Sequence, residues 1–300
     1  MHTPLAHWQH QASAIVSGFL GDWLESRRNP LAVTMQMQQA GQTLHLDATP
    51  AIDNPKRTLI ILVHGLTEME TIWDFPGRPG YNYATALSER LGATALTVRY
   101  NSGRAIHQNG RDFSLMIEQL VAAWPVPVEN LFLLGHSMGG LLIRSACHYG
   151  QDASHTWIDH LDSCVYLGSP HDGSWLARLA QGTTGLMQQM PRDYLRAAAD
   201  LVNLRSVGIR NLNQGVILEE DDTAPLLPEV RHFAVCGLIG RRRAHLVNRL
   251  VGDALVHEDS ACGRGQTGWT LDGEVVFAGI DHIRLAHHPQ VLAQLEEWLQ

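Results

Sequence analysis

The pentapeptide Gly135-His136-Ser137-Met138-Gly139 constrains the fold of this chain more than any other segment. It follows the apolar run 131–134 and precedes a helical pattern at 140–147. A strand that passes directly into a helix turns sharply, and the residue at the apex projects its side chain from strained backbone. The flanking glycines lack a Cβ and so let the strand and the helix approach closely. We therefore predict that the Ser137 hydroxyl is exposed at a strand–turn–helix junction.

Strand-like and helix-like segments alternate along most of the chain. An antiparallel hairpin is predicted at 31–38 and 42–49, and the final helix begins at Pro289. Helices are also predicted at 81–91 and 112–124. Strands are predicted at 58–63, 93–100, 131–134, 163–167, 231–238 and 274–280. The first of them is a continuous apolar run, which is typical of a buried parallel strand. This alternation predicts an α/β fold in which a mostly parallel sheet is flanked by helices on both faces.

The interval 174–228 interrupts this alternation. It is helical in character, lacks a clear strand pattern and is rich in Met and Gln. A long insertion with its own helices is usually functional in a compact domain. We interpret it as an inserted helical cap on a core formed by 31–173 and 229–300. Residues 1–30 are expected to form an amphipathic helix packed on that core.

The composition is that of a soluble globular protein, with 45% hydrophobic and 17% charged residues. A formal net charge of −8 argues against nucleic acid or an anionic membrane as a partner, because either requires a basic face. The chain has no apolar run long enough to span a membrane and no signal-peptide pattern, so a cytoplasmic protein is expected. The 17 histidines are scattered without metal-ligand spacing, so neither a metal nor an organic cofactor is expected. Cys147, Cys164 and Cys236 lie in apolar segments and are expected in the core.

A serine hydroxyl is a weak nucleophile alone and needs a base that accepts its proton. In an architecture of this type the histidine is expected after the last strand. His282 directly follows the predicted strand 274–280 and is our candidate. His287 and His288, at the start of the last helix, are the alternatives.

A carboxylate that orients this base is expected after the strand at 231–238. Asp253 follows a glycine and precedes apolar residues, which suits a buried turn with an inward carboxylate. The competing carboxylates are Glu258, Asp259 and Asp281.

Attack of a serine on an acyl carbon also requires two N–H donors for the oxyanion that forms. One is expected from Met138, directly after the serine. The other is expected from Leu66, in the loop after strand 58–63, where Gly65 lets the backbone approach closely. His136 is interpreted as a packed or capping histidine rather than a second base.

Together these segments resemble an α/β-hydrolase of the lipase and esterase type. The chain is most similar to the bacterial PGAP1-like group, which resembles the catalytic domain of GPI inositol-deacylases. The resemblance covers roughly 57–300 and lies in segments 62–66, 99–103, 135–140, 167–173, 251–253 and 281–291. It implies the α/β-hydrolase fold, a triad of Ser137, Asp253 and His282, and an oxyanion hole formed by Leu66 and Met138. One departure is Ala254, where the group more often has glycine.

The resemblance implies hydrolysis of carboxylic esters, from short acyl esters to lipids and, in an open pocket, polyesters. Lipase, thioesterase and acyltransferase activities on the same triad remain alternatives, as does a non-catalytic protein of this fold that binds a ligand. The expected partner is a small-molecule or lipid ester. The residues expected to line its pocket are His64, Glu68, Trp73, His136, His171, Met187 and Met190.

Overall fold

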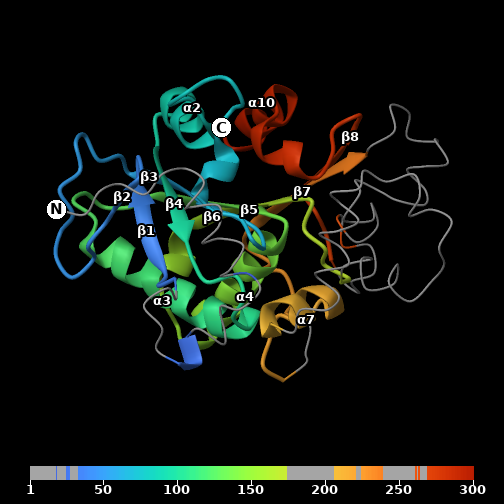
Figure 1. Cartoon of the computed structure of the whole chain (residues 1–300). Coiled ribbons are helices and arrows are strands. Elements are labelled where there is room, and N and C mark those ends of the chain that lie inside the picture. The colour runs from blue at the N-terminus through green and yellow to red at the C-terminus, as the bar shows by residue number, and fades with distance from the viewer. Residues whose placement is uncertain are drawn as a thin grey trace, which may run out of the picture.

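The computed structural model describes residues 18, 25–27, 33–173, 206–220, 224–238, 261, 263 and 269–300. Within this part of the chain an eight-stranded sheet crosses the molecule in the order β2-β1-β4-β3-β5-β6-β7-β8 (Figure 1). Strands β3 to β8 are parallel, whereas β1 and β2 form an antiparallel hairpin at one edge. The strands are β1 (Gln36–Gln39), β2 (Gln42–Thr43), β3 (Thr58–Val63), β4 (Thr94–Arg99), β5 (Asn130–His136), β6 (Leu161–Leu167), β7 (Arg231–Leu238) and β8 (Gly273–Ala278).

Helices cover both faces of the sheet, as the alternating pattern predicts. α2 and α10 pack on one face, and α3 and α4 pack on the other, with α7 beside α3 (Figure 1). The α-helices are α2 (Tyr83–Leu91), α3 (Ile106–Ala123), α4 (Met138–Asp152), α7 (Val207–Gln214) and α10 (Pro289–Trp298). The 3-10 helices are η1 (Glu70–Trp73), η2 (Thr156–His160) and η4 (Ile283–His287). The predicted α/β class is therefore confirmed.

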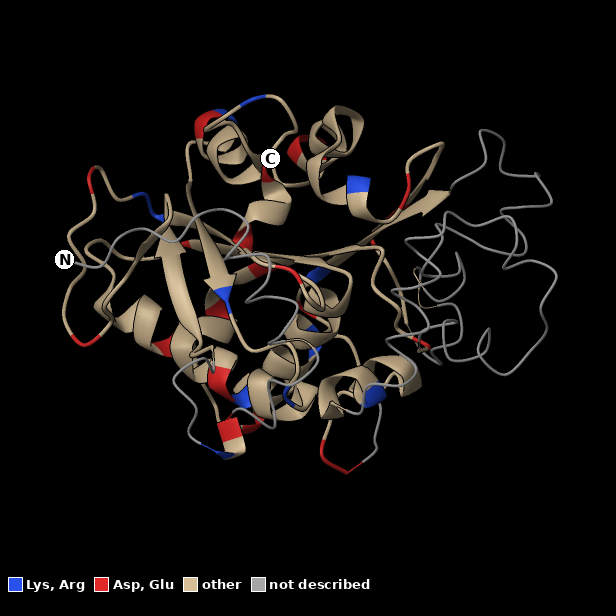
Figure 2. Cartoon of the chain, in the orientation of Figure 1, with Lys and Arg blue, Asp and Glu red and all other residues tan. Residues whose placement is uncertain are grey.

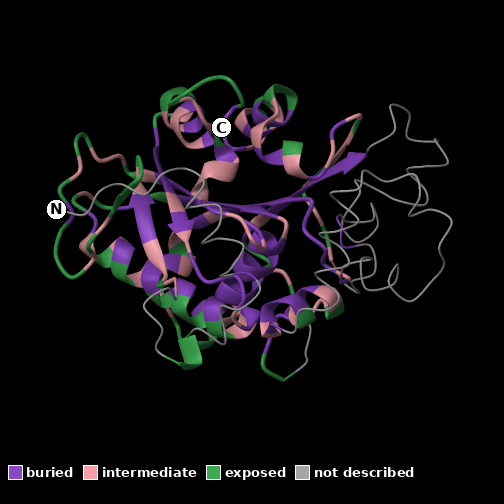
Figure 3. Cartoon of the chain, in the orientation of Figure 1, coloured by how far each residue is buried: buried purple, intermediate pink, exposed green. Residues whose placement is uncertain are grey.

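Two hydrophobic cores, one on each face, hold these layers together. Successive residues of a strand point to opposite faces of the sheet. In β3, Leu59 and Ile61 therefore join the core under α3 and α4, whereas Ile60 and Leu62 join the core under α2 and α10. All four side chains are fully buried, and Figure 3 shows burial concentrated in the strands between the two edges of the sheet. This two-sided burial explains why the strands are continuous apolar runs in the sequence.

α3 is longer than the pattern predicts. The sequence indicates a helix from residue 112, but the helix begins at Ile106. Asn109 and Gly110 in the added turns have low helix propensity. The Asn109 side-chain amide donates to the carbonyl of Asn101 over 2.8 Å, and Asn109 is buried. This tertiary contact stabilises a turn of helix that local propensity does not favour.

The described part of the predicted cap packs on the core. In α7, Leu212 belongs to the core under α3 and α4, and the Asn211 side chain accepts a hydrogen bond from the N–H of Ile106 at 3.2 Å. Residues 174–205 and 221–223 lie outside the described residues, so the boundaries of a cap remain a prediction. The same applies to the N-terminal helix, of which Gly18 and the segment 25–27 are described.

Acidic and basic residues are interspersed over the loops and helices in the view of Figure 2, rather than gathered on one side. No described helix combines the length and apolarity that crossing a membrane requires. Cys147, Cys164 and Cys236 are buried with free thiols, which confirms their predicted place in the core. Cys262 lies outside the described residues.

Candidate active site

The carboxyl ends of β3 and β5 mark the point where the chain changes direction across the sheet. The two strands are parallel neighbours, with Val63 opposite Gly135. From β3 the chain crosses to β4 on one side, and from β5 it crosses to β6 on the other. Connections that leave in opposite directions separate the following loops and open a crevice, which is where α/β sheets bind ligands. Two segments meet here: the β3 loop (residues 64–69) and the elbow (residues 135–139).

Ser137 occupies the apex of the elbow. It lies between the last residue of β5 and the first residue of α4, with φ 53° and ψ −123°, a conformation that non-glycine residues rarely adopt. Its N–H donates to the carbonyl of Leu167 over 2.8 Å, which ties the apex to β6. Ser137 is partly exposed, whereas the other four residues of the elbow are buried. The predicted strand–turn–helix junction is therefore present in the fold.

The β3 loop lies in contact with this apex. A Cβ placed on Gly65 would lie 2.9 Å from the Cβ of Ser137, so only glycine permits this approach. Leu66, the next residue, is half-buried against the core under α3 and α4. Thr67 has φ 58°, and its N–H donates to the Ser102 hydroxyl at 3.1 Å, which fixes the turn of the loop.

Met138 is the first residue of α4, and it is buried. The first N–H groups of a helix have no intrahelical acceptor. The Met138 N–H therefore belongs to the positive end of the α4 dipole, directly after Ser137.

His282 returns to the elbow from the far edge strand of the sheet. After β8 the chain turns back through a bridge between Leu238 and Ile280. The buried His282 imidazole then lies against Gly168, where an added Cβ would lie 3.0 Å from its Nδ1. Gly168 directly follows Leu167, whose carbonyl accepts the Ser137 N–H. The imidazole therefore packs on the loop that also holds the apex of the elbow.

His136 connects the β3 loop to His282. Its Nδ1 lies 2.9 Å from Glu68 Oε2, and its Nε2 lies 2.9 Å from the backbone carbonyl oxygen of His282. The rings of His136 and His282 are 4.9 Å apart between centroids. His136 is fully buried, with the edge of the Trp73 ring beside it at 6.3 Å. It is a packed histidine, as the sequence indicates.

Glu68 is held by the same cluster. Its Oε2 also accepts the N–H of Gly65 over 2.8 Å. Burial opposes ionisation of this carboxyl, but the charge and hydrogen bond of His136 outweigh that effect. The His282 charge and the Gly65 N–H contribute in the same direction, and the pKa of Glu68 falls below its ordinary value.

The other residues predicted to line the pocket lie in the interior of the protein. His64 is buried, donates from Nδ1 to the Gly65 carbonyl at 2.9 Å and stacks on Tyr100 at 4.4 Å. Trp73 and His171 are also buried. Contact of these side chains with a substrate remains a prediction. Asp253, Met187 and Met190 lie outside the described residues.

The alternative candidates that the structure describes have other partners. His287 donates from Nδ1 to the carbonyl of Ile72 at 3.0 Å, on the α2 side of the sheet. His288 caps α10 by accepting the Gln290 N–H at 3.3 Å. Asp281 accepts the N–H of Arg284 at 3.1 Å. Glu258 and Asp259 lie outside the described residues.

A buried arginine behind the elbow was not anticipated from the sequence. Arg144 of α4 donates to the Ala224 carbonyl at 2.8 Å, and its guanidinium lies 4.2 Å from the ring centre of Trp269. Burial lowers the pKa of Arg144 to about 10. Burial and the Arg144 charge hold the pKa of His171, 3.4 Å away, well below its ordinary value. A charged residue within the apolar pattern of a predicted helix is the signal that indicates such a contact.

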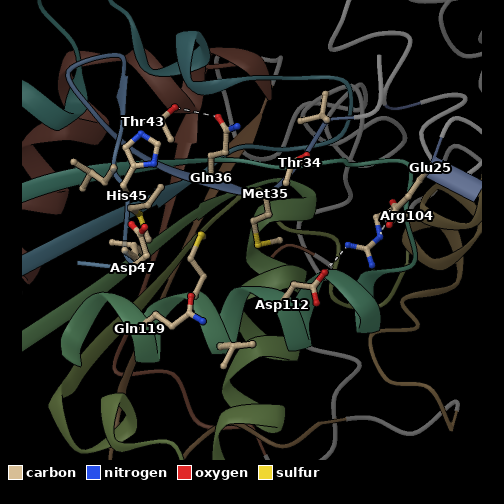
Figure 4. A pocket seen from close by; sticks show the side chains of 16 residues that line it. Glu25, Thr34, Met35, Gln36, Thr43, His45, Asp47, Arg104, Asp112 and Gln119 are labelled. Atoms are coloured by element: carbon tan, nitrogen blue, oxygen red, sulfur yellow. Dashed lines mark hydrogen bonds and ion pairs between the residues drawn. The ribbon is translucent and has the colours of Figure 1, made fainter. Parts of the chain in front are cut away.

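A cavity of about 800 Å³ lies apart from the elbow, between the β1–β2 hairpin and α3 (Figure 4). Arg104 closes one end through ion pairs with Glu25 at 2.9 Å and Asp112 at 2.6 Å. Neither Ser137 nor His282 lines this cavity. It is therefore separate from the candidate active site.

Solved structures show the same fold. The chain superposes on the mature form of the lipase BlEst2 from Bacillus licheniformis with a TM-score of 0.57 and 18% identity, over 84% of this chain and 96% of that chain. An esterase from Pyrobaculum calidifontis gives a TM-score of 0.52 and 12% identity, over 97% of this chain and 91% of that chain. No curated protein sequence gives a significant match. These superpositions show that the chain has the α/β-hydrolase fold.

Within this class the sequence match is to a particular family. Residues 106–236, from the start of α3 into β7, match the PGAP1-like alpha/beta domain family. The match includes the elbow and β6 but neither the β3 loop nor His282. It confirms the resemblance to the PGAP1-like group that the sequence motifs indicate.

Proposed function

We propose that this protein is a serine hydrolase that cleaves carboxylic esters of short to medium acyl chain length. The observation that carries the proposal is the strained, partly exposed Ser137. It lies where the connections that follow β3 and β5 leave in opposite directions. Strain of this kind persists only where the surrounding structure imposes it, and it is concentrated at functional sites. The names of the two structural neighbours, a lipase and an esterase, are consistent with ester cleavage.

The proposed reaction has two steps with opposite proton transfers. The Ser137 Oγ attacks the ester carbonyl carbon while His282 accepts the hydroxyl proton, and the N–H groups of Leu66 and Met138 donate to the oxyanion. His282 then returns the proton to the departing alcohol, which leaves an acyl group on Ser137. Water, deprotonated by His282, attacks this acyl-enzyme, and His282 returns the proton to the Ser137 Oγ as the acid is released. Asp253 is the proposed acceptor for the other nitrogen of His282.

Two features of the described residues support this assignment of roles. Gly65 approaches Ser137 so closely that no side chain fits between them. Leu66 is the next residue of the β3 loop, so its N–H is close in sequence to this contact. His282 packs on Gly168, beside the residue that accepts the Ser137 N–H. The acyl chain is proposed to lie against the apolar residues of the interval 174–228, including Met187 and Met190.

A series of p-nitrophenyl esters from acetate to palmitate tests the proposal. We expect cleavage to be fastest between butyrate and octanoate. Ser137→Ala should lower kcat by about 10⁴- to 10⁶-fold with the fold retained. Ser88→Ala is the matched control, because it removes a hydroxyl on α2 that bonds the Ala95 N–H away from the elbow. Full activity of Ser137→Ala would contradict the proposal.

The same assay separates the alternatives. A maximum with long emulsified acyl chains would assign a lipase, and a preference for acyl-CoA would assign a thioesterase. Transfer of the acyl group to an added alcohol in preference to water would assign an acyltransferase. Absence of turnover with every ester, together with ligand binding that Ser137→Ala retains, would assign a binding protein of this fold.

A further inference from the structure

The contact between Glu68 and His136 joins three segments that the proposed reaction uses. Glu68 Oε2 holds the Gly65 N–H of the β3 loop, and His136 is the elbow residue before Ser137. The other ring nitrogen of His136 contacts the backbone carbonyl of His282. The β3 loop, the elbow and the His282 segment are otherwise far apart in the sequence. One buried pair therefore links all three.

The partners of His136 determine how many protons it carries. A carbonyl oxygen only accepts hydrogen bonds, so the Nε2 that faces the His282 carbonyl bears a proton. Glu68 Oε2 accepts the Gly65 N–H, and the pKa of Glu68 lies below its ordinary value, so this carboxyl is ionised and only accepts. The Nδ1 that faces this oxygen therefore bears a proton as well. Two protonated nitrogens make the ring an imidazolium.

We propose that His136 is a permanent imidazolium paired with the Glu68 carboxylate, and that this partly buried ion pair positions the β3 loop, the elbow and His282 for catalysis. Both are positioning residues in this account, since neither touches the reacting atoms. The inference rests on the proposed function for its catalytic consequence, whereas the protonation state stands independently.

Strand geometry explains why the pair forms. Alternation along β5 places His136 on the same face as Phe132 and Leu134, which belong to the core under α2 and α10. The η4 helix that follows His282 packs in that same core through Leu285. The parallel register of β3 with β5 brings the β3 loop alongside the elbow.

Titratable groups face His136 from two segments of the described chain. Glu68 faces it from the β3 loop, and the His282 ring faces it from the segment after β8. From η1 the nearest side chain is the uncharged Trp73. Glu70 pairs with Arg99. Loss of the Glu68 charge would therefore remove the carboxylate that contacts the imidazolium.

An amide cannot replace the Glu68 carboxylate here. A single oxygen, Oε2, accepts from both Gly65 and His136. In Glu68→Gln an amide NH₂ at that position would oppose the Gly65 N–H, and an amide oxygen there would lack the negative charge that stabilises the imidazolium. The variant is therefore expected to lose the Nδ1 proton of His136. Glu70→Gln, two residues away, is the matched control because it removes a carboxylate that pairs with Arg99 instead.

The protonation state is tested by two-bond ¹H–¹⁵N NMR of the histidine rings at pH 8, with His136 assigned through backbone connectivity. We expect both ring nitrogens of His136 to show imidazolium shifts in the wild-type protein and in Glu70→Gln. In Glu68→Gln we expect the neutral Nε2–H form. A neutral His136 in the wild-type protein would overturn the ion pair. This result comes from the wild-type protein alone and does not depend on whether a variant folds.

Ester hydrolysis tests the positioning role. Glu68→Gln should lower kcat by about 10- to 100-fold with a smaller change in KM, because misplacement by about 1 Å has this effect. Its kcat should also decline with rising pH over a range in which the wild-type kcat does not, as His136 loses its proton. Glu70→Gln should stay within about twofold of wild type. A Glu68→Gln variant with wild-type kcat and pH profile would overturn the positioning role alone, whereas activity in Ser137→Ala would overturn the proposed function.

Discussion

His282 lies against Gly168 so closely that a Cβ on the glycine would sit 3.0 Å from the imidazole Nδ1. Gly168 also has φ +61°, a conformation that favours glycine. Any side chain at this position would both strain the backbone and displace the ring. The loop after β6 therefore fixes the position of the His282 imidazole, the proposed base.

Replacement of Gly168 tests this contact. Gly168→Ala should lower kcat for ester hydrolysis by at least about tenfold, because the imidazole has to move. It should also lower the free energy of unfolding by about 1–2 kcal/mol, because alanine is strained at positive φ. Urea unfolding and steady-state kinetics measure the two effects. Gly92→Ala is the control, since Gly92 has φ +62° but open space around its Cβ position. Equal loss of kcat in both variants would contradict the contact.

The backbone strain at Ser137 has a measurable energetic cost. Ser137→Gly and Ser137→Ala both remove the hydroxyl, but only glycine adopts φ 53° without penalty. Ser137→Gly should therefore exceed Ser137→Ala in unfolding free energy by about 1 kcal/mol. Urea denaturation of the two variants gives this difference directly. Equal stability, or a more stable alanine variant, would show that the elbow is not strained.

The hydroxyl of Tyr83 holds the chain just after His282. It lies 2.9 Å from the Leu285 carbonyl and 3.0 Å from the His288 carbonyl, and it accepts the His288 N–H at 3.0 Å. Tyr83→Phe removes the hydroxyl that the Leu285 carbonyl and the His288 N–H bond, and should cost about 1–3 kcal/mol. The loss is measured by chemical denaturation. Tyr81→Phe, on a half-buried residue of the same segment, serves for comparison and should change stability by less.

The lowered pKa of His232 should make the stability of the protein depend on pH. Burial lowers its pKa to about 4, while its ring contacts the Tyr166 hydroxyl and the Leu227 carbonyl. Asp272 acts in the opposite direction, and Arg144 acts in the same direction as burial. Between pH 6.5 and about 4 the unfolded chain binds a proton at this site that the folded chain excludes. Stability should therefore fall on acidification through this range, by about 3 kcal/mol from this group.

The contribution of His232 is isolated by comparison of variants. Unfolding free energies at pH 7 and pH 4.5 should differ less in His232→Gln than in the wild-type protein. His45→Gln, at an exposed position, should keep the wild-type difference. An unchanged pH dependence in His232→Gln would contradict the assignment.

The local features of this fold were predictable, and several long-range contacts were not. The strand–turn–helix junction at Ser137 follows from a pattern of about 15 consecutive residues, and the six parallel strands follow from their apolar runs. α3 begins six residues earlier than predicted because the contact of Asn109 with Asn101 is tertiary.

The candidate site shows the same division. His282 was expected near the elbow from its place after the last strand, and the structure packs it on Gly168. The bond between Glu68 and His136 depends on the register of β3 with β5, which the sequence does not specify, so Glu68 was interpreted as a pocket residue. The role of Asp253 remains a prediction, because that residue lies outside the described part of the chain.

Covalent labelling of the serine tests the central claim most directly. The protein is treated with a p-nitrophenyl alkylphosphonate, which mimics the tetrahedral intermediate, and digested for peptide mass spectrometry. We predict one phosphonyl group per chain, attached to Ser137, with loss of ester hydrolysis in proportion to labelling. Labelling at another residue, or full hydrolytic activity in protein that is completely labelled at Ser137, would contradict the account.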